Sequence, residues 1–102
     1  MTGSPGGSRI ITAVLQVLLN VIDHRMPLPE AVHAPRVHHQ WLPDETMVEG
    51  WMPTETMQAL EARGHRVTVW PSFSSVQSIL VTPRGLVGAA DTRTRGATAA
   101  GY

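Results

Sequence analysis

Residues 5–22 read PGGSRIITAVLQVLLNVI, a glycine pair followed directly by a long apolar run. From Arg9 onward, polar residues recur three or four positions apart, at 12, 16, 20 and 23, which is the spacing of one helix face. Apolar side chains occupy the rest of the circumference. We therefore predict a long buried helix that is covered on most sides, partly by chain outside these 102 residues. Ser8 precedes the run at the position expected of an N-cap.

The remaining sequence predicts two short helices and then strands, an α+β fold. One helix is expected at residues 29–34, between two prolines. A second is expected at 54–63, from Pro53 to the terminating Gly64. Residues 35–43 lack periodicity and predict an ordered loop, whereas the small, polar tail from Asp91 predicts mobility. Strands are expected at 46–49, 66–70, 77–82 and 86–90, the last two forming a hairpin around Pro83-Arg84-Gly85.

The composition narrows the classes of function. Eight arginines balance eight acidic residues and are scattered, so the chain has no charge pattern typical of a nucleic-acid or anionic-membrane partner. The absence of cysteine excludes disulfides, thiol nucleophiles and cysteine metal sites. The apolar run at 10–22 is too short and too polar for a bilayer span, and no signal-peptide cleavage pattern follows it.

Gly6 and Gly7 are the candidate functional residues. Backbone N–H groups at a helix start lack partners inside the helix, and the helix dipole favours negative charge there. In acyl transfer that charge is the oxygen of the tetrahedral intermediate, and glycine leaves the approach open. An isolated glycine pair is nevertheless more often a plain helix-start loop. A phosphate-binding P-loop is excluded because no Lys-Ser/Thr follows the glycines.

Two other pairs of residues invite a chemical interpretation. His38-His39 suggests a metal site, but adjacent residues rarely face one ion, and we expect both rings to fix the surrounding loop by hydrogen bonds. Asp44-Glu45 suggests an acid/base pair, but a solvated turn is favoured because sequence neighbours usually diverge. Neither a metal nor a cofactor is predicted.

Residues 2–12, TGSPGGSRIIT, resemble the glycine motif of bacterial γ-glutamyltranspeptidases, also called glutathione hydrolases. Further blocks resemble the same family in the same order along the chain. Their colinearity, which ends on the family's own C-terminal motif, makes the resemblance specific and places it in the C-terminal part of the small subunit. These blocks are 30–36, 38–45, 60–65, 77–79, 88–91 and the terminal Ala100-Gly101-Tyr102.

The resemblance implies part of an N-terminal nucleophile hydrolase, a four-layer αββα sandwich formed by a precursor that cleaves itself into two subunits. It implies that residues 1–102 form a single C-terminal fragment of the small subunit. A threonine upstream of this chain would attack γ-glutamyl amides such as glutathione and pass the acyl group to water, amino acids or peptides. Gly6 and Gly7 would donate their N–H groups to the oxyanion.

The implied partners are the large subunit and the rest of the small subunit. The chain alone is therefore expected to be inactive, and a periplasmic or secreted location follows if the protein is like the bacterial family. Two alternatives stay open: a non-catalytic assembly piece that complements a separately encoded partner, and a pseudogene product.

Two positions depart from the family pattern. Arg25 follows the long helix where relatives tend to have glycine, and a left-handed cap there would cost about 1 kcal/mol. The family's usual Ser-Asp-Pro reads Ala90-Asp91-Thr92, which leaves open any active-site role of that segment.

Overall fold

The computed structural model describes residues 1–101, so Tyr102 of the resemblance's last motif lies outside the described residues. Within these residues the chain forms three helices and two three-stranded sheets, which confirms the predicted α+β class. Contacts divide the chain into two compact units. One combines residues 1–34 with residues from 74 onward, and the other is Pro35–Phe73.

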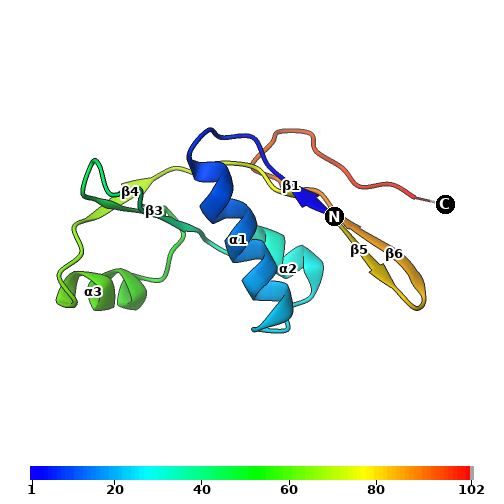
Figure 1. The fold of residues 1–102 in the computed structure, drawn as a ribbon, viewed down its shortest axis with the longest axis horizontal. Helices are drawn as coiled ribbons and strands as arrows, with labels where there is room; N and C mark the ends of the chain where they lie inside the picture. Colours follow the sequence, from blue (N-terminus) through cyan, green and yellow to red (C-terminus); the bar gives the residue numbers. More distant parts are fainter. Residues whose placement is uncertain (102) are drawn as a thin grey trace. The chain divides into compact units, whose positions relative to one another are not determined.

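The first unit packs two helices against an antiparallel sheet with strand order β1-β5-β6. Helix α2 contacts β5 and β6, and α1 contacts α2 and β1 (Figure 1). The elements are α1 (Arg9–Ile22), α2 (Leu28–His33), β1 (Thr2–Gly3), β5 (Gln77–Thr82) and β6 (Gly85–Ala89). The core between them consists of Ala13, Val17, Leu28, Val32, Val76 and Ala89.

Strand β1 was missed by the sequence prediction, which treated this region as turn formers. Thr2 pairs with Ser78 in antiparallel register, and their hydroxyl oxygens lie 2.8 Å apart. Ile79 N–H donates to the Met1 carbonyl at 2.8 Å. The start of the chain is therefore a third strand on the predicted hairpin of β5 and β6.

Helix α1 begins and ends close to the predicted residues, but it is only partly covered in this chain. Ala13 and Val17 are buried, whereas Ile11 and Ile22 are 74% and 68% exposed. Ser8 occupies the N-cap position, yet among the described residues its side chain makes no capping hydrogen bond. The expectation that absent chain covers the rest of α1 stays a prediction.

The second unit joins a parallel strand pair through a helix. Strand β3 (Thr46–Glu49) pairs in parallel with β4 (Val67–Trp70), and α3 (Thr54–Ala62) connects them, as parallel pairing requires. Strand β2 (Val37–His38) lies antiparallel to β3 inside the stretch predicted as loop. The buried Glu49 carboxylate accepts the backbone N–H groups of Arg36 at 2.9 Å and Phe73 at 3.1 Å.

The histidine pair has the structural role expected of it. His38 Nε2 lies 3.0 Å from Gln40 Oε1, and His39 Nε2 lies 3.1 Å from Asp44 Oδ1. Asp44 and Glu45 have different partners, because Glu45 accepts the Thr68 hydroxyl at 2.8 Å. The two rings therefore fix their own loop, and the two carboxylates do not form one site.

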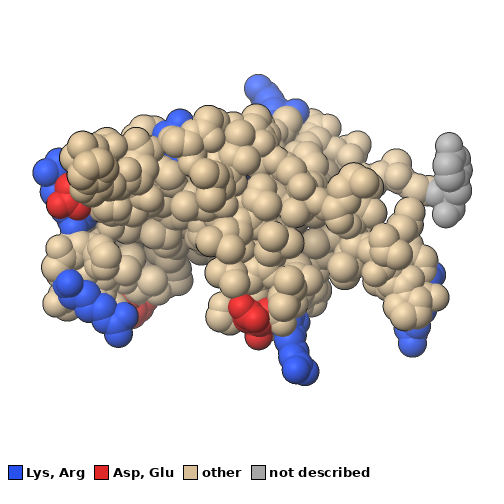
Figure 2. Space-filling model, viewed as in Figure 1, with Lys and Arg blue, Asp and Glu red and all other residues tan. Residues whose placement is uncertain are grey.

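Charged residues are dispersed on the face shown in Figure 2, where arginines and carboxylates stand in small separate spots. In residues 1–101, no helix combines the length and apolar character needed to cross a bilayer.

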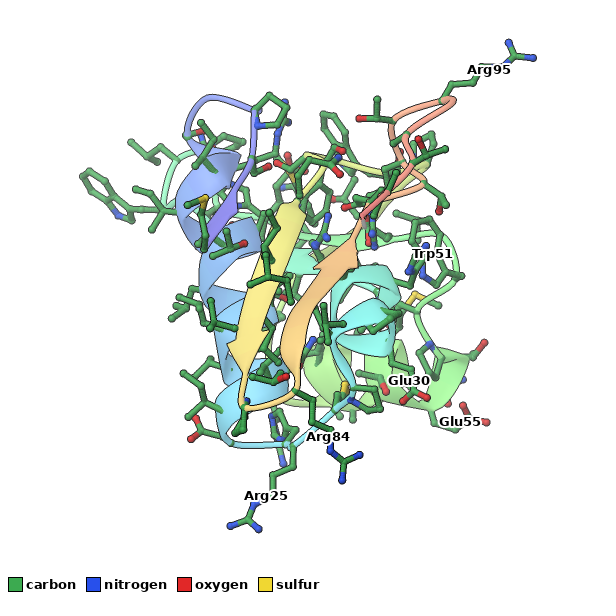
Figure 3. The ribbon with its side chains drawn as sticks, turned by 90° about the vertical axis from the view of Figure 1, so that its right-hand side faces the viewer. Arg25, Glu30, Trp51, Glu55, Arg84 and Arg95 are labelled. Carbon is green, nitrogen blue, oxygen red and sulfur yellow. The ribbon has the colours of Figure 1, made fainter. Side chains whose placement is uncertain are left out.

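Arg25 adopts a left-handed conformation, with φ 54°, where relatives tend to have glycine. Met26 N–H donates to the Asn20 carbonyl at 2.9 Å, which closes the chain back onto the last turn of α1. The Arg25 side chain points into solvent (Figure 3). Arginine thus occupies a position whose backbone favours glycine.

We expect Arg25→Gly to stabilise the protein by about 1 kcal/mol, because glycine adopts this conformation without steric cost. The measurement is the thermal midpoint of unfolding. Arg84→Gly is the control, since Arg84 is exposed and has no positive φ. A midpoint for Arg25→Gly no higher than that of the parent would contradict the assignment of strain.

Candidate functional site

The loop that carries Gly6 and Gly7 is a turn that only glycine adopts easily. Their φ angles are 132° and 60°, both in the region that disfavours side chains. The Gly6 carbonyl accepts Arg9 N–H at 3.2 Å, and the Gly7 carbonyl accepts Ile10 N–H at 3.1 Å. The carbonyls of the pair thus start α1.

Unlike their carbonyls, the backbone N–H groups of Gly6 and Gly7 take no part in starting α1. Among residues 1–101, neither Gly6 N–H nor Gly7 N–H donates a hydrogen bond. They lie at the helix end where the macrodipole places about half a positive charge. Such groups can bind an anionic oxygen, which matches the chemistry expected from the sequence.

Ser74 closes one side of Gly6. A Cβ built on Gly6 would overlap Ser74 Oγ and would lie 3.6 Å from Ser74 Cα, whereas one on Gly7 would have no described heavy atom within 4 Å. Ser74 itself has φ 62°. Its Oγ is buried without a hydrogen-bond partner in the described part of the chain.

The segment that follows Ser74 is bonded to the glycine loop and to the tail. Ser75 N–H donates to Ser4 Oγ at 3.2 Å, two residues before Gly6. The Thr94 hydroxyl donates to Ser75 Oγ at 2.6 Å, and Val76 N–H donates to Asp91 Oδ2 at 2.8 Å. The glycine loop, residues 75–76 and the tail residues 91–94, far apart in sequence, are therefore joined by hydrogen bonds.

The prediction that the tail is mobile from Asp91 onward is wrong for its first residues. Asp91 is fully buried, and the Arg93 side chain is 4% exposed and pairs with it at 3.1 Å. Arg93 also donates to the carbonyls of Val32 and Ala34, each at 2.9 Å. The partners are backbone groups about 60 positions away, so no local pattern indicates them.

A cavity of about 760 Å³ opens beside this region. Small and apolar residues line it, among them Gly3, Pro5, Ile79 and Ala99. Neither Gly6 nor Gly7 is among its lining residues, so we do not assign the chemistry to it.

Comparison with known proteins gives one consistent family. The family model described as gamma-glutamyltranspeptidase matches residues 1–101. The glutathione hydrolase proenzyme of Escherichia coli K12 is 52% identical over 103 residues, which cover 100% of this chain and 18% of that protein. The Acylase ACY 1 proenzyme of Pseudomonas sp. V22 is 43% identical over 97 residues, which cover 92% of this chain and 17% of that protein.

Solved structures agree with the sequence matches. The γ-glutamyltranspeptidase of Pseudomonas nitroreducens superposes with a TM-score of 0.87 at 38% identity, over 99% of this chain and 54% of that one. This chain thus spans less than a fifth of the length of the curated relatives named above. From its sequence and its fold, this chain belongs to the γ-glutamyltranspeptidase family.

Proposed function

We propose that this chain supplies the oxyanion hole of a γ-glutamyltransferase of the glutathione hydrolase type, with Gly6 and Gly7 as the donors. One observation carries the proposal: both N–H groups are unpaired among residues 1–101, on a loop whose carbonyls are already used to start α1. The family supplies the class of reaction, and the loop geometry supports the role of the pair.

In this mechanism a threonine outside the chain attacks the γ-glutamyl carbonyl of a substrate such as glutathione. The carbonyl oxygen becomes an anion as the tetrahedral intermediate forms, and the two glycine N–H groups donate to it. The C–N bond then breaks as the leaving amine takes up the proton released by the threonine hydroxyl. The acyl-threonine passes the γ-glutamyl group to water or to an amino acid or peptide, whose proton returns to the threonine oxygen. Fixed donors aimed at the developing charge accelerate each step that creates it.

The partners in this proposal are the rest of the small subunit and the large subunit. Support comes from the apolar surface that α1 leaves open, because exposed apolar patches of this kind mark interfaces. The exposed apolar side chains on α1 are Ile11, Leu15, Leu18, Leu19 and Ile22. No cofactor is required by this chemistry.

A second candidate function is amide acylase activity on other substrates, which the match to an acylase proenzyme favours. Both reactions pass through a tetrahedral oxyanion, so Gly6 and Gly7 have the same role in each. The higher identity to the Escherichia coli glutathione hydrolase, 52% against 43%, favours the γ-glutamyl substrate.

The direct test places the chain where its relative has the matching segment. We define the chimera as the Escherichia coli proenzyme with that segment replaced by this 102-residue chain. We expect the chimera to hydrolyse a γ-glutamyl anilide and the isolated chain to show no turnover, because the chain has an oxyanion hole without a nucleophile. Turnover by the isolated chain that is lost in Gly6→Ala would contradict the proposal, as would a folded but inactive chimera.

A mixing experiment separates the enzyme part from an assembly piece. The isolated chain is mixed with the Escherichia coli proenzyme that lacks the matching segment. Activity gained on mixing would support a piece that complements a separate partner. Activity only in the fused chimera would support one continuous subunit.

A further inference from the structure

The proposed function leaves one buried ion pair, between Asp91 and Arg93, without a role. The Asp91 side chain is fully buried, and that of Arg93 is 4% exposed. Arg93 binds the two carbonyls at the end of α2, so the pair is fixed to the helical layer of its unit. Buried ion pairs are costly to desolvate, and here both members make further hydrogen bonds that offset this cost.

Asp91 holds the segment 75–77 from two directions. Its Oδ2 accepts Val76 N–H at 2.8 Å, and its own N–H donates to Gln77 Oε1 at 3.1 Å. Gln77 Nε2 in turn donates to Ser75 Oγ at 2.9 Å. Segment 75–77 is therefore fixed both through its backbone and through its side chains.

The same segment supports the glycine loop. Ser75 N–H donates to Ser4 Oγ, and Ser74 Oγ fills the space beside Gly6 in which a side chain would lie. Ser74 has a left-handed backbone and a buried hydroxyl without a partner among the described residues. Such a conformation is unfavourable for a residue with a side chain and persists only where the surroundings determine it. The bonds from Asp91 and Thr94 to the next two residues supply that constraint.

We propose that Asp91 is a positioning residue for the oxyanion hole: it fixes Val76 and so holds Ser74 and Ser75 against the loop that carries Gly6. This inference rests on the proposed function, since it assigns Asp91 to the same site. Asp91 does not touch the reacting atoms. Its effect passes through the orientation of two backbone N–H groups.

The test is Asp91→Ala in the chimera, with Leu28→Ala as the matched control. Leu28 is a buried core residue of the same unit, so its truncation also destabilises the unit. We expect Asp91→Ala to lower kcat by about tenfold or more with KM nearly unchanged, because small misplacements of catalytic groups affect mainly the transition state. Leu28→Ala, compared at a temperature where both are folded, is expected to retain kcat within about twofold. Equal losses of kcat in the two variants would overturn the proposal.

If Asp91→Ala fails to fold, Thr94→Val tests whether the bonds that hold segment 75–77 affect turnover. It removes the hydroxyl that donates to Ser75 Oγ with little change of volume, from a residue that is exposed overall. A kcat below that of the parent chimera, with an unchanged thermal midpoint, supports positioning through segment 75–77. A kcat equal to that of the parent overturns it.

Gly6→Ala in the same chimera separates this inference from the proposed function. If Gly6→Ala is fully active, the oxyanion-hole assignment itself fails. If Gly6→Ala is inactive and Asp91→Ala behaves like Leu28→Ala, only the positioning role of Asp91 fails.

Discussion

Gly6→Ala is expected to lower kcat of the chimera by about 10²–10³-fold, the loss typical of removing one oxyanion donor. Two features cause the loss. The new Cβ would overlap Ser74 Oγ, and φ 132° is a conformation that alanine rarely adopts. The loop must therefore shift, and the Gly6 N–H moves away from the oxygen that it stabilises. KM is expected to change little, because the donor acts mainly in the transition state.

Gly3→Ala is the control for this variant. Gly3 lies on β1 of the same loop region, has no positive φ, and has no described heavy atom within 4 Å of a built Cβ. Steady-state turnover of a γ-glutamyl anilide by the matured enzyme is the measurement. Similar kcat values for Gly6→Ala and Gly3→Ala would contradict the assignment of Gly6.

Arg93→Met is expected to destabilise the chimera by about 3–5 kcal/mol, the cost of leaving one member of a buried ion pair alone. Methionine fills much of the space but donates nothing. Asp91 would then lose its partner at 3.1 Å, and the carbonyls of Val32 and Ala34 would lose their donors. The midpoint of denaturant unfolding is the measurement.

Arg95→Met provides a matched control on the same tail. Arg95 is exposed and its side chain points into solvent (Figure 3). Its substitution is expected to shift stability by less than about 0.5 kcal/mol. If the two variants unfold at the same midpoint, the buried pair does not stabilise this unit.

The elements that could be predicted from the sequence are those with local signals. The periodicity after Arg9 predicted α1, Gly64 marked the end of α3, and the turn before Gly85 predicted the hairpin. In each case the responsible residues lie within a few positions of the structure that they determine.

The parts that could not be predicted depend on distant partners. Strand β1 is two residues long and pairs with residues about 75 positions away. Asp91 lies in a small, polar stretch whose composition suggests mobility, yet it is fully buried, and its carboxylate binds Val76 N–H and Arg93. The candidate site likewise has a part with a local sequence signal and a part that depends on distant residues. Gly6 and Gly7 are proposed from a local motif and a family resemblance, whereas the contact between Ser74 and Gly6 could be seen only in the folded structure.

A crystal structure of the chimera, trapped as a covalent γ-glutamyl complex on its threonine, tests directly whether Gly6 and Gly7 form the oxyanion hole. We expect the oxygen of the trapped acyl group to lie about 2.7–3.1 Å from the backbone nitrogens of both glycines, the range of a functioning oxyanion hole. An acyl oxygen that points away from this loop, or that is bound by other donors, would contradict this assignment.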